Sequence, residues 1–174
     1  FTAGNHEDFD ALLALAGSSG RDADFVVDAY AKIRCIKNGR IVITPNGLNV
    51  GALWGVDGEG RNARRKLPPT AYIQRGAANQ LLGAPMDVLL THDAPIDAIR
   101  VGYGSEIIEE IIRLAEPRCA FFGHYEQRGT GFGWGVDVGF GRAEIRVLGR
   151  GLAHVVHTAK LAGSLESSVL TSLL

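Results

Sequence analysis

Residues 86–124 read MDVLLTHDAPIDAIRVGYGSEIIEEIIRLAEPRCAFFGH, and they carry the clearest structural signals of the chain. The two ends of this stretch, 86–90 and 119–122, are short apolar runs typical of buried strands. Between them Ser105 is placed to cap a helix whose isoleucines recur at helical spacing, and Pro117 ends that helix. Strand, helix and strand in this order form a βαβ unit, so the sequence predicts an α/β fold.

The rest of the chain predicts further elements around this unit. Apolar residues from Phe9 onward recur at helical spacing until residues 17–20, GSSG. Residues 31–56 predict three short strands, with Asn38-Gly39 as the hairpin turn between 33–36 and 41–43, and a third run at 48–54. Thr70 predicts the start of a helix that runs to about residue 82. Strands are expected near 143–148 and 152–157, and a short helix or loose tail from residue 165.

Length and composition fit one globular domain, residues 1–174. The chain has 46% hydrophobic and 21% charged residues, and its net charge of −1 gives no general attraction to nucleic acid or membrane. No apolar run approaches the roughly 20 residues of a membrane span, and no secretory signal is visible. Two cysteines, Cys35 and Cys119, are too few for a disulfide framework, which favours a cytoplasmic location. Residues 1–3 have the pattern of a strand end, so we expect a domain truncated at its N-terminus.

Three histidines, His6, His92 and His124, each follow a predicted strand. In open α/β sheets, ligands bind beyond the carboxyl ends of the strands. The polar neighbours of these histidines are Asn5, Asp93 and Glu126. Imidazole, carboxamide and carboxylate groups together suit a divalent transition metal. The sequence therefore predicts a metal site at one edge of the sheet.

Three segments at these strand ends resemble ordered motifs of the calcineurin-like metallophosphoesterase superfamily. They are GNHE at 4–7, THDAP at 91–95 and FGHYE at 122–126, and they match the last three of five family blocks. The first two blocks, D-x-H and G-D, lie upstream in the family and are missing from this sequence. The resemblance covers residues 1–126, and it implies part of a four-layer α/β/β/α sandwich with mixed β-sheets.

The resemblance implies a role for each matching residue. Asn5, His92 and His124 match ligands of one metal, and His6 matches a histidine near the leaving group, a candidate general acid or transition-state stabiliser. The family places a second histidine, a ligand of the other metal, where this chain has Glu126. A carboxylate also binds Mn, Fe or Zn, so two divalent metal ions are expected.

Four further residues are weaker candidates. Glu7 and Asp93 are candidates to orient neighbouring imidazoles, with a helix cap or a surface acid as the alternative. Arg100 and Tyr103, in the loop after His92, are candidates to contact a phosphate, with an ordinary surface loop as the alternative.

The implied function is metal-dependent hydrolysis of a phosphomonoester or phosphodiester by a metal-bridged hydroxide that attacks phosphorus in line. Residues 1–174 alone are expected to be weakly active or inactive. Replacement of the second family histidine by Glu126 leaves open a non-catalytic scaffold with the same fold. A third alternative is a nucleic-acid phosphodiesterase of the lariat-debranching type, supported by residues 61–75, which hold five basic residues and no acid.

Two other patterns predict structure rather than a site. His154 and His157 lie three apart in a predicted strand, so their side chains face opposite sides and do not form one site. The glycine-rich residues 129–141 lack the phosphate-binding loop pattern, and turn formation is the better explanation.

Overall fold

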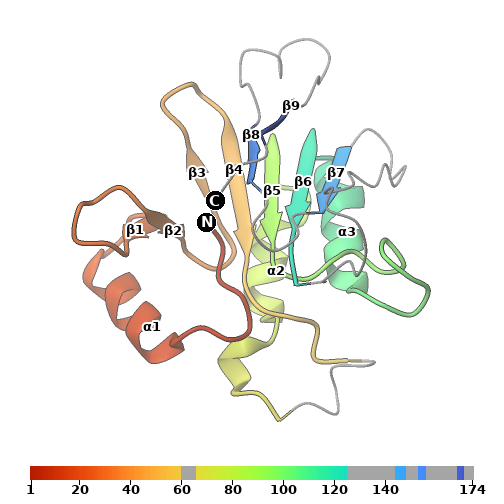
Figure 1. The fold of residues 1–174 in the computed structure, drawn as a ribbon, viewed down its shortest axis with the longest axis horizontal. Helices are drawn as coiled ribbons and strands as arrows, with labels where there is room; N and C mark the ends of the chain where they lie inside the picture. The colour runs from red at the N-terminus through yellow and green to blue at the C-terminus, as the bar shows by residue number, and fades with distance from the viewer. Residues whose placement is uncertain (60–65, 125–143, 148–152, 156–167, 171–174) are drawn as a thin grey trace.

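The computed structural model describes residues 1–59, 66–124, 144–147, 153–155 and 168–170. Its centre is a five-stranded sheet in the order β3-β4-β5-β6-β7, shown in Figure 1. The strands are β3 (Arg40–Ile43), β4 (Asn49–Leu53), β5 (Val88–Thr91), β6 (Cys119–Phe122) and β7 (Glu144–Val147). β3 runs antiparallel to β4, and β4 to β7 run parallel to one another. The predicted α/β class with a mixed sheet is therefore confirmed, and the four-layer sandwich stays a prediction.

The predicted βαβ unit is confirmed at β5, α3 (Glu106–Ala115) and β6. Ser105 caps α3 by accepting a hydrogen bond from the backbone N–H of Ile108, and Glu106 lies in the first turn, where the helix dipole favours an acid. Glu116 ends the helix in the left-handed conformation, directly before Pro117.

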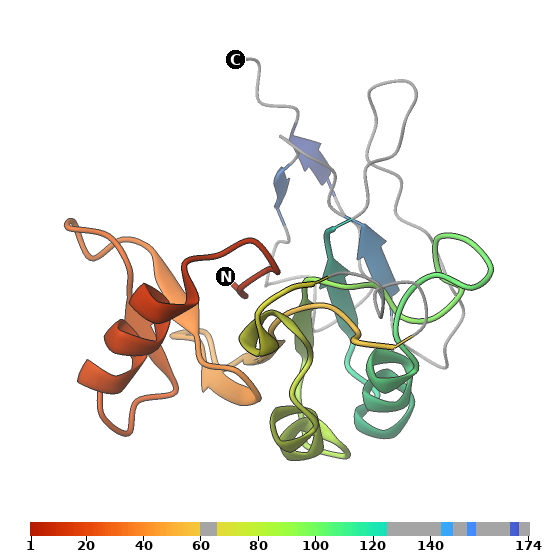
Figure 2. The ribbon, with the colours of Figure 1, turned by 90° about the horizontal axis from the view of Figure 1, so that it is seen from below.

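Two helices cover one face of the sheet and make the main core. Figure 2 shows α2 (Arg75–Leu81) and α3 together on the same side of the strands. Their buried side chains pack against Leu53, Leu89 and Phe122 from three neighbouring strands. On the opposite face Cys119 packs with Val88 and is 1% exposed.

A second, smaller core lies beside the sheet. α1 (Phe9–Ser18) packs on the antiparallel pair β1 (Asp24–Val26) and β2 (Arg34–Ile36), through Phe9, Phe25 and Trp54. The segment 1–3 is not a regular strand, but the Ile36 N–H donates to the Phe1 carbonyl and the Gly55 N–H donates to the Ala3 carbonyl. These bonds hold the start of the chain between β2 and the end of β4.

The predicted hairpin at Asn38-Gly39 is wrong. β2 pairs with β1, which the sequence pattern did not predict, and β3 pairs with β4 through the turn at 44–48. The polar groups of Asn38 and Gly39 bond to β4 and the residue after it. The Asn38 side chain accepts from the backbone N–H of Trp54, and the Gly39 N–H donates to the Ala52 carbonyl. The chain therefore passes from one sheet to the next at this turn.

Two other predictions are corrected. The helix predicted from Thr70 begins at Arg75, and Thr70 lies in a short 3-10 helix, Pro69–Ala71. Tyr72 forms a β-bridge with Val56 and so does not join a helix. The Val56 N–H donates to the Ala71 carbonyl, and the Ile73 N–H donates to the Val56 carbonyl. The expected helix or tail after residue 165 contains a strand, β9 (Ser168–Leu170), which pairs with β8 (Ala153–Val155) in the predicted region.

Candidate metal centre

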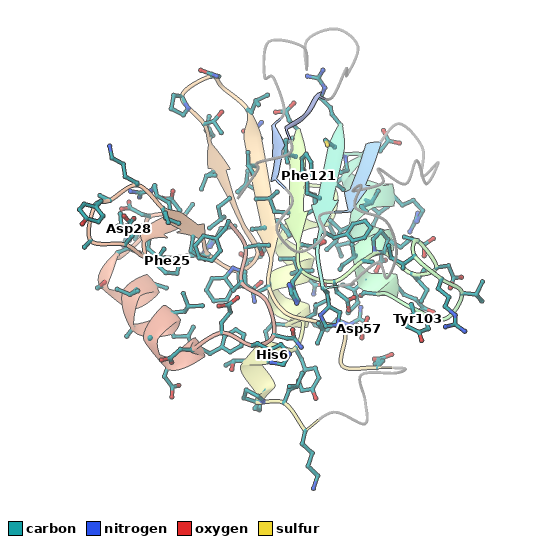
Figure 3. All side chains as sticks on the ribbon, viewed as in Figure 1. His6, Phe25, Asp28, Asp57, Tyr103 and Phe121 are labelled. Carbon is teal, nitrogen blue, oxygen red and sulfur yellow. The ribbon has the colours of Figure 1, made fainter. Side chains whose placement is uncertain are left out.

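The carboxyl ends of the parallel strands bring the predicted site residues to one edge of the sheet. His92 directly follows β5, and His124 lies two residues beyond β6. The 4–7 turn reaches the same edge because the segment before it is bonded to the end of β4. Figure 3 shows His6 and Asp57 at this edge. The strand-end argument thus placed the right segments together.

Three side-chain donor atoms converge there. His92 Nε2 lies 2.9 Å from Asn5 Oδ1 and 3.0 Å from His124 Nδ1. The two imidazole rings meet edge to face, with their centroids 4.8 Å apart. A single ring nitrogen offers either one proton or one lone pair, so it can fully satisfy only one of these two partners. Close approach of both partners to the same nitrogen is what a shared cation would explain.

Backbone contacts hold the two histidines in register. The Gly123 N–H donates to the His92 carbonyl at 3.1 Å, which joins the ends of β5 and β6. His124 has a φ of 66°, a left-handed conformation that is uncommon for a residue with a side chain. Gly4 packs against the His92 ring so closely that an added Cβ would lie 2.9 Å from its Cε1 atom. Such local strain is typical of functional sites.

The surroundings of His92 favour its neutral form. Burial, followed by charge repulsion from His124 and His6, lowers the pKa of His92 from 6.5 to about 4. A neutral imidazole keeps a lone pair available for a metal at physiological pH. Metal ligation and the electrostatics of this site therefore favour the same protonation state.

Asn5 is 3% exposed, and its amide nitrogen is buried without a hydrogen-bond partner among the described residues. A buried unpaired amide donor costs about 1–3 kcal/mol. The oxygen of this amide, in contrast, points at His92. The Asn5 atom that faces the two histidines is therefore its oxygen, which is the atom that a metal would bind.

The described donors fit one divalent metal ion. In octahedral coordination, metal–ligand bonds of about 2.0–2.1 Å place neighbouring ligand atoms about 3 Å apart, close to the two distances in this structure. Among the residues that the structure describes, no three His, Cys, Asp or Glu side chains are grouped to hold a metal. The candidate ligands that lie together are two imidazoles and one carboxamide. Glu126, the predicted ligand of a second metal, lies outside the described residues.

The other predicted site residues lie in varied surroundings. His6 is exposed and close enough to affect the pKa of His92. Glu7 accepts a hydrogen bond from the Gly4 N–H, which closes the 4–7 turn. The Arg100 guanidinium lies over the Tyr103 ring, 5.3 Å from its centroid, in the loop between β5 and α3. This contact lies within the loop itself.

Asp93 is fully buried, and its carboxylate holds backbone groups. Its carboxylate accepts from the N–H groups of Asp57 and Ala94, both at 2.9 Å. Asp57 was not among the candidates identified from the sequence. In the structure it is buried, at 7% exposed, and its carboxylate accepts from the Ser105 hydroxyl at 2.6 Å. Its position just beyond β4 is the signal that could have found it, since the strand-end argument applies to β4 as well.

Several weaker predictions fall largely outside the description. Two of the five basic residues in segment 61–75, Lys66 and Arg75, are among the described residues, and both are exposed. The glycine-rich residues 129–141 and His157 lie outside the described residues, and His154 is described only as part of β8. Within the described part of the chain, no helix combines the length and apolar character needed to cross a bilayer.

Comparisons with known proteins give a likeness in fold. No family model and no curated protein matches this sequence. Among solved structures, TT1561 of Thermus thermophilus matches with a TM-score of 0.56 and 13% identity, over 97% of this chain and 70% of TT1561. At this identity the match concerns the path of the chain and not its chemistry. In fold, then, this chain is similar to TT1561.

Proposed function

We propose that this chain belongs to a metal-dependent phosphoesterase of the calcineurin-like type. The observation that carries the proposal is the convergence of Asn5 Oδ1, His92 Nε2 and His124 Nδ1 at the carboxyl edge of a parallel sheet. The three ordered sequence motifs support it independently, and the fold-level likeness to TT1561 is compatible with it.

Each residue has a part in the proposed reaction. Asn5, His92 and His124 would hold one divalent ion, Mn, Fe or Zn, and a second ion would need Glu126 and the family's upstream blocks. When bound, such ions polarise the phosphoryl oxygens and make a water nucleophilic near neutral pH. The exposed His6, which is near enough to affect the pKa of His92, would give a proton to the departing alcohol oxygen of a phosphomonoester or phosphodiester.

Metal binding is the first test, because it needs only the residues described. Residues 1–174 should bind Mn²⁺ or Zn²⁺ weakly, at no more than one site per chain, in equilibrium titration and metal analysis. His92→Ala and His124→Ala should each abolish that binding. The matched control is Asn79→Ala on the exposed face of α2, compared with Asn5→Ala at the site. Equal affinity in Asn5→Ala and Asn79→Ala would remove the carboxamide from the proposed ligand set.

Catalysis is the second test. The complete gene product with Mn²⁺ should hydrolyse p-nitrophenyl phosphate or its bis-ester, while residues 1–174 alone should turn over little. His6→Ala should lower turnover without loss of metal. Activity that survives both His92→Ala and His124→Ala would refute the proposal.

A non-catalytic scaffold is the second candidate, favoured by Glu126 in the position of the second family histidine. It predicts less than about one metal ion per complete chain and no esterase activity.

The lariat-debranching alternative makes a different prediction. Neutralising the arginines of segment 61–75 should then weaken nucleic-acid binding and flatten its dependence on salt.

A further inference from the structure

A closed ring of hydrogen bonds joins three chain segments directly behind the candidate metal centre. The Asp57 N–H donates to Asp93 Oδ2 at 2.9 Å, and the Ser105 N–H donates to the Ala94 carbonyl at 2.8 Å. The Ser105 hydroxyl then donates to Asp57 Oδ2 at 2.6 Å and completes the ring. The ring links the exit of β4, the turn after β5 and the start of α3.

Asp57 is the member of this ring that contacts both other segments. Its backbone holds Asp93, its Oδ2 holds Ser105, and its Oδ1 accepts from the Glu59 N–H. All three ring side chains are buried, with Asp93 and Ser105 at 0% exposed and Asp57 at 7%. A carboxylate beside the first turn of α3 is also stabilised by the helix dipole.

Asp93, a member of this ring of hydrogen bonds, is the residue directly after His92. Asp93 is fixed through both carboxylate oxygens and through its own carbonyl, which accepts from the Thr91 hydroxyl at 2.7 Å. The His92 carbonyl is fixed from the other side by Gly123. The direction of the His92 imidazole therefore depends on a turn that the Asp57 N–H holds from β4 and that the Asp57 carboxylate holds from α3, through Ser105. Residues that orient a metal ligand typically change metal affinity by about 10–100-fold when mutated.

We propose that Asp57 is a positioning residue that sets the His92 imidazole against Asn5 and His124. Its role toward a metal rests on the proposed function, but its role toward the imidazole pair concerns the metal-free chain. The competing explanation is that Asp57 only stabilises the fold, as any buried hydrogen-bonded carboxylate would.

The chain contains a matched control at the opposite end of the same strand. Asp87 directly precedes β5, and its Oδ2 accepts from the Asn49 N–H at the start of β4 at 2.9 Å. Asp87 joins β4 to β5 through its carboxylate and through its own N–H, which donates to the Asn49 carbonyl, whereas Asp57 does so through its backbone N–H. Only Asp57 does so at the edge that carries the histidines.

The experiment compares Asp57→Ala, Asp57→Asn and Asp87→Ala in residues 1–174, each confirmed as folded by circular dichroism. The first readout is the nuclear Overhauser effect between ring protons of His92 and His124 in metal-free protein, where the ring centroids lie 4.8 Å apart. The second readout is the Mn²⁺ dissociation constant. Asp57→Ala keeps the N–H that donates to Asp93 but removes the acceptor of the Ser105 hydroxyl, which frees the turn after β5 from the start of α3. The contact between the His92 and His124 rings should then weaken, and Mn²⁺ binding should weaken about 10–100-fold. Asp57→Asn should restore part of both, and Asp87→Ala should lower only the unfolding midpoint.

The two proposals fail in different ways. If the wild-type chain binds no Mn²⁺, the proposed function fails. In that case the contact between the His92 and His124 imidazole rings alone decides the role of Asp57. If Asp57→Ala and Asp87→Ala keep the same ring contact and the same affinity, the positioning role is overturned. Should Asp57→Ala not fold, the pair Asp57→Asn and Asp87→Asn is compared by the same two readouts and the same criterion.

Discussion

Gly4→Ala should distort the candidate metal centre while leaving every donor atom in place. A Cβ at residue 4 would lie 2.9, 3.0 and 3.2 Å from the Cε1, Nδ1 and Nε2 atoms of His92. Gly4 is not among the residues with a positive φ, so alanine fits the backbone and the effect comes from this contact alone. Ordinary van der Waals contact begins at 3.4 Å, so the ring must retreat by about 3.4 − 2.9 = 0.5 Å.

A movement of this size is large for the site. The contacts of His92 Nε2 at 2.9 and 3.0 Å would lengthen or misalign, and metal ligation tolerates only about 0.2 Å. We expect the metal-free protein to lose about 1–3 kcal/mol of unfolding free energy, the usual cost of overpacking. Mn²⁺ affinity should fall at least about tenfold, as it does when the support of a metal ligand is disturbed.

Urea denaturation and Mn²⁺ titration measure the two effects. The control is Gly76→Ala in α2, an exposed helical glycine with no atom within 4 Å of an added Cβ. That variant should gain about 0.5–1 kcal/mol, because alanine favours the helix, and should keep its metal affinity. The reasoning is refuted if Gly4→Ala behaves like Gly76→Ala in both measurements.

Three further predictions concern protonation, capping and the core. The pKa of His92 lies at about 4 in the folded chain and 6.5 as reference, so the unfolded chain binds its proton first. The unfolding free energy of the metal-free protein should therefore decrease as the pH is lowered from 6.5 to 4. In urea titrations this decrease should be on the order of 2 kcal/mol larger in the wild type than in His92→Gln. Ser105→Ala removes the cap of α3 and the partner of Asp57, and should cost about 1–3 kcal/mol in the same assay, whereas Ser18→Ala at the end of α1 should cost less than about 0.5 kcal/mol. Ile111→Ala empties a fully buried position of α3 and should cost about 2–5 kcal/mol; a cost below about 1 kcal/mol would contradict the assigned core.

Local signals were sufficient for the central βαβ unit. The cap at Ser105, the isoleucine spacing of α3 and the stop at Pro117 all act within one or two helical turns, so they can be read from the sequence. The strands β5 and β6 follow from short apolar runs, which are typical of strands buried in a parallel sheet. His92 and His124 follow these two strands, which explains why their positions at strand ends were predictable.

Strand pairing was less predictable, because a short strand does not encode its partner. β2 and β3 flank an Asn-Gly turn that favours a hairpin, but each pairs with another strand. The choice was made by tertiary contacts of the turn itself, since Asn38 binds the Trp54 N–H and Gly39 binds Ala52. The late start of α2 has the same kind of cause, a bridge to Val56 from a distant loop.

Strand ends and turns are local features, so the order of residues was enough to show which side chains stand there. Asn5, His92 and His124 became candidates in this way. Their distances came from the folded chain, in which Asn5 Oδ1 and His92 Nε2, 87 residues apart in sequence, lie 2.9 Å from each other. The place of Asp57 behind them also came from folding, since it depends on β4 lying next to β5. Spacing along a chain fixes the direction of a side chain, whereas distances between segments are fixed by packing and by hydrogen bonds across the sheet.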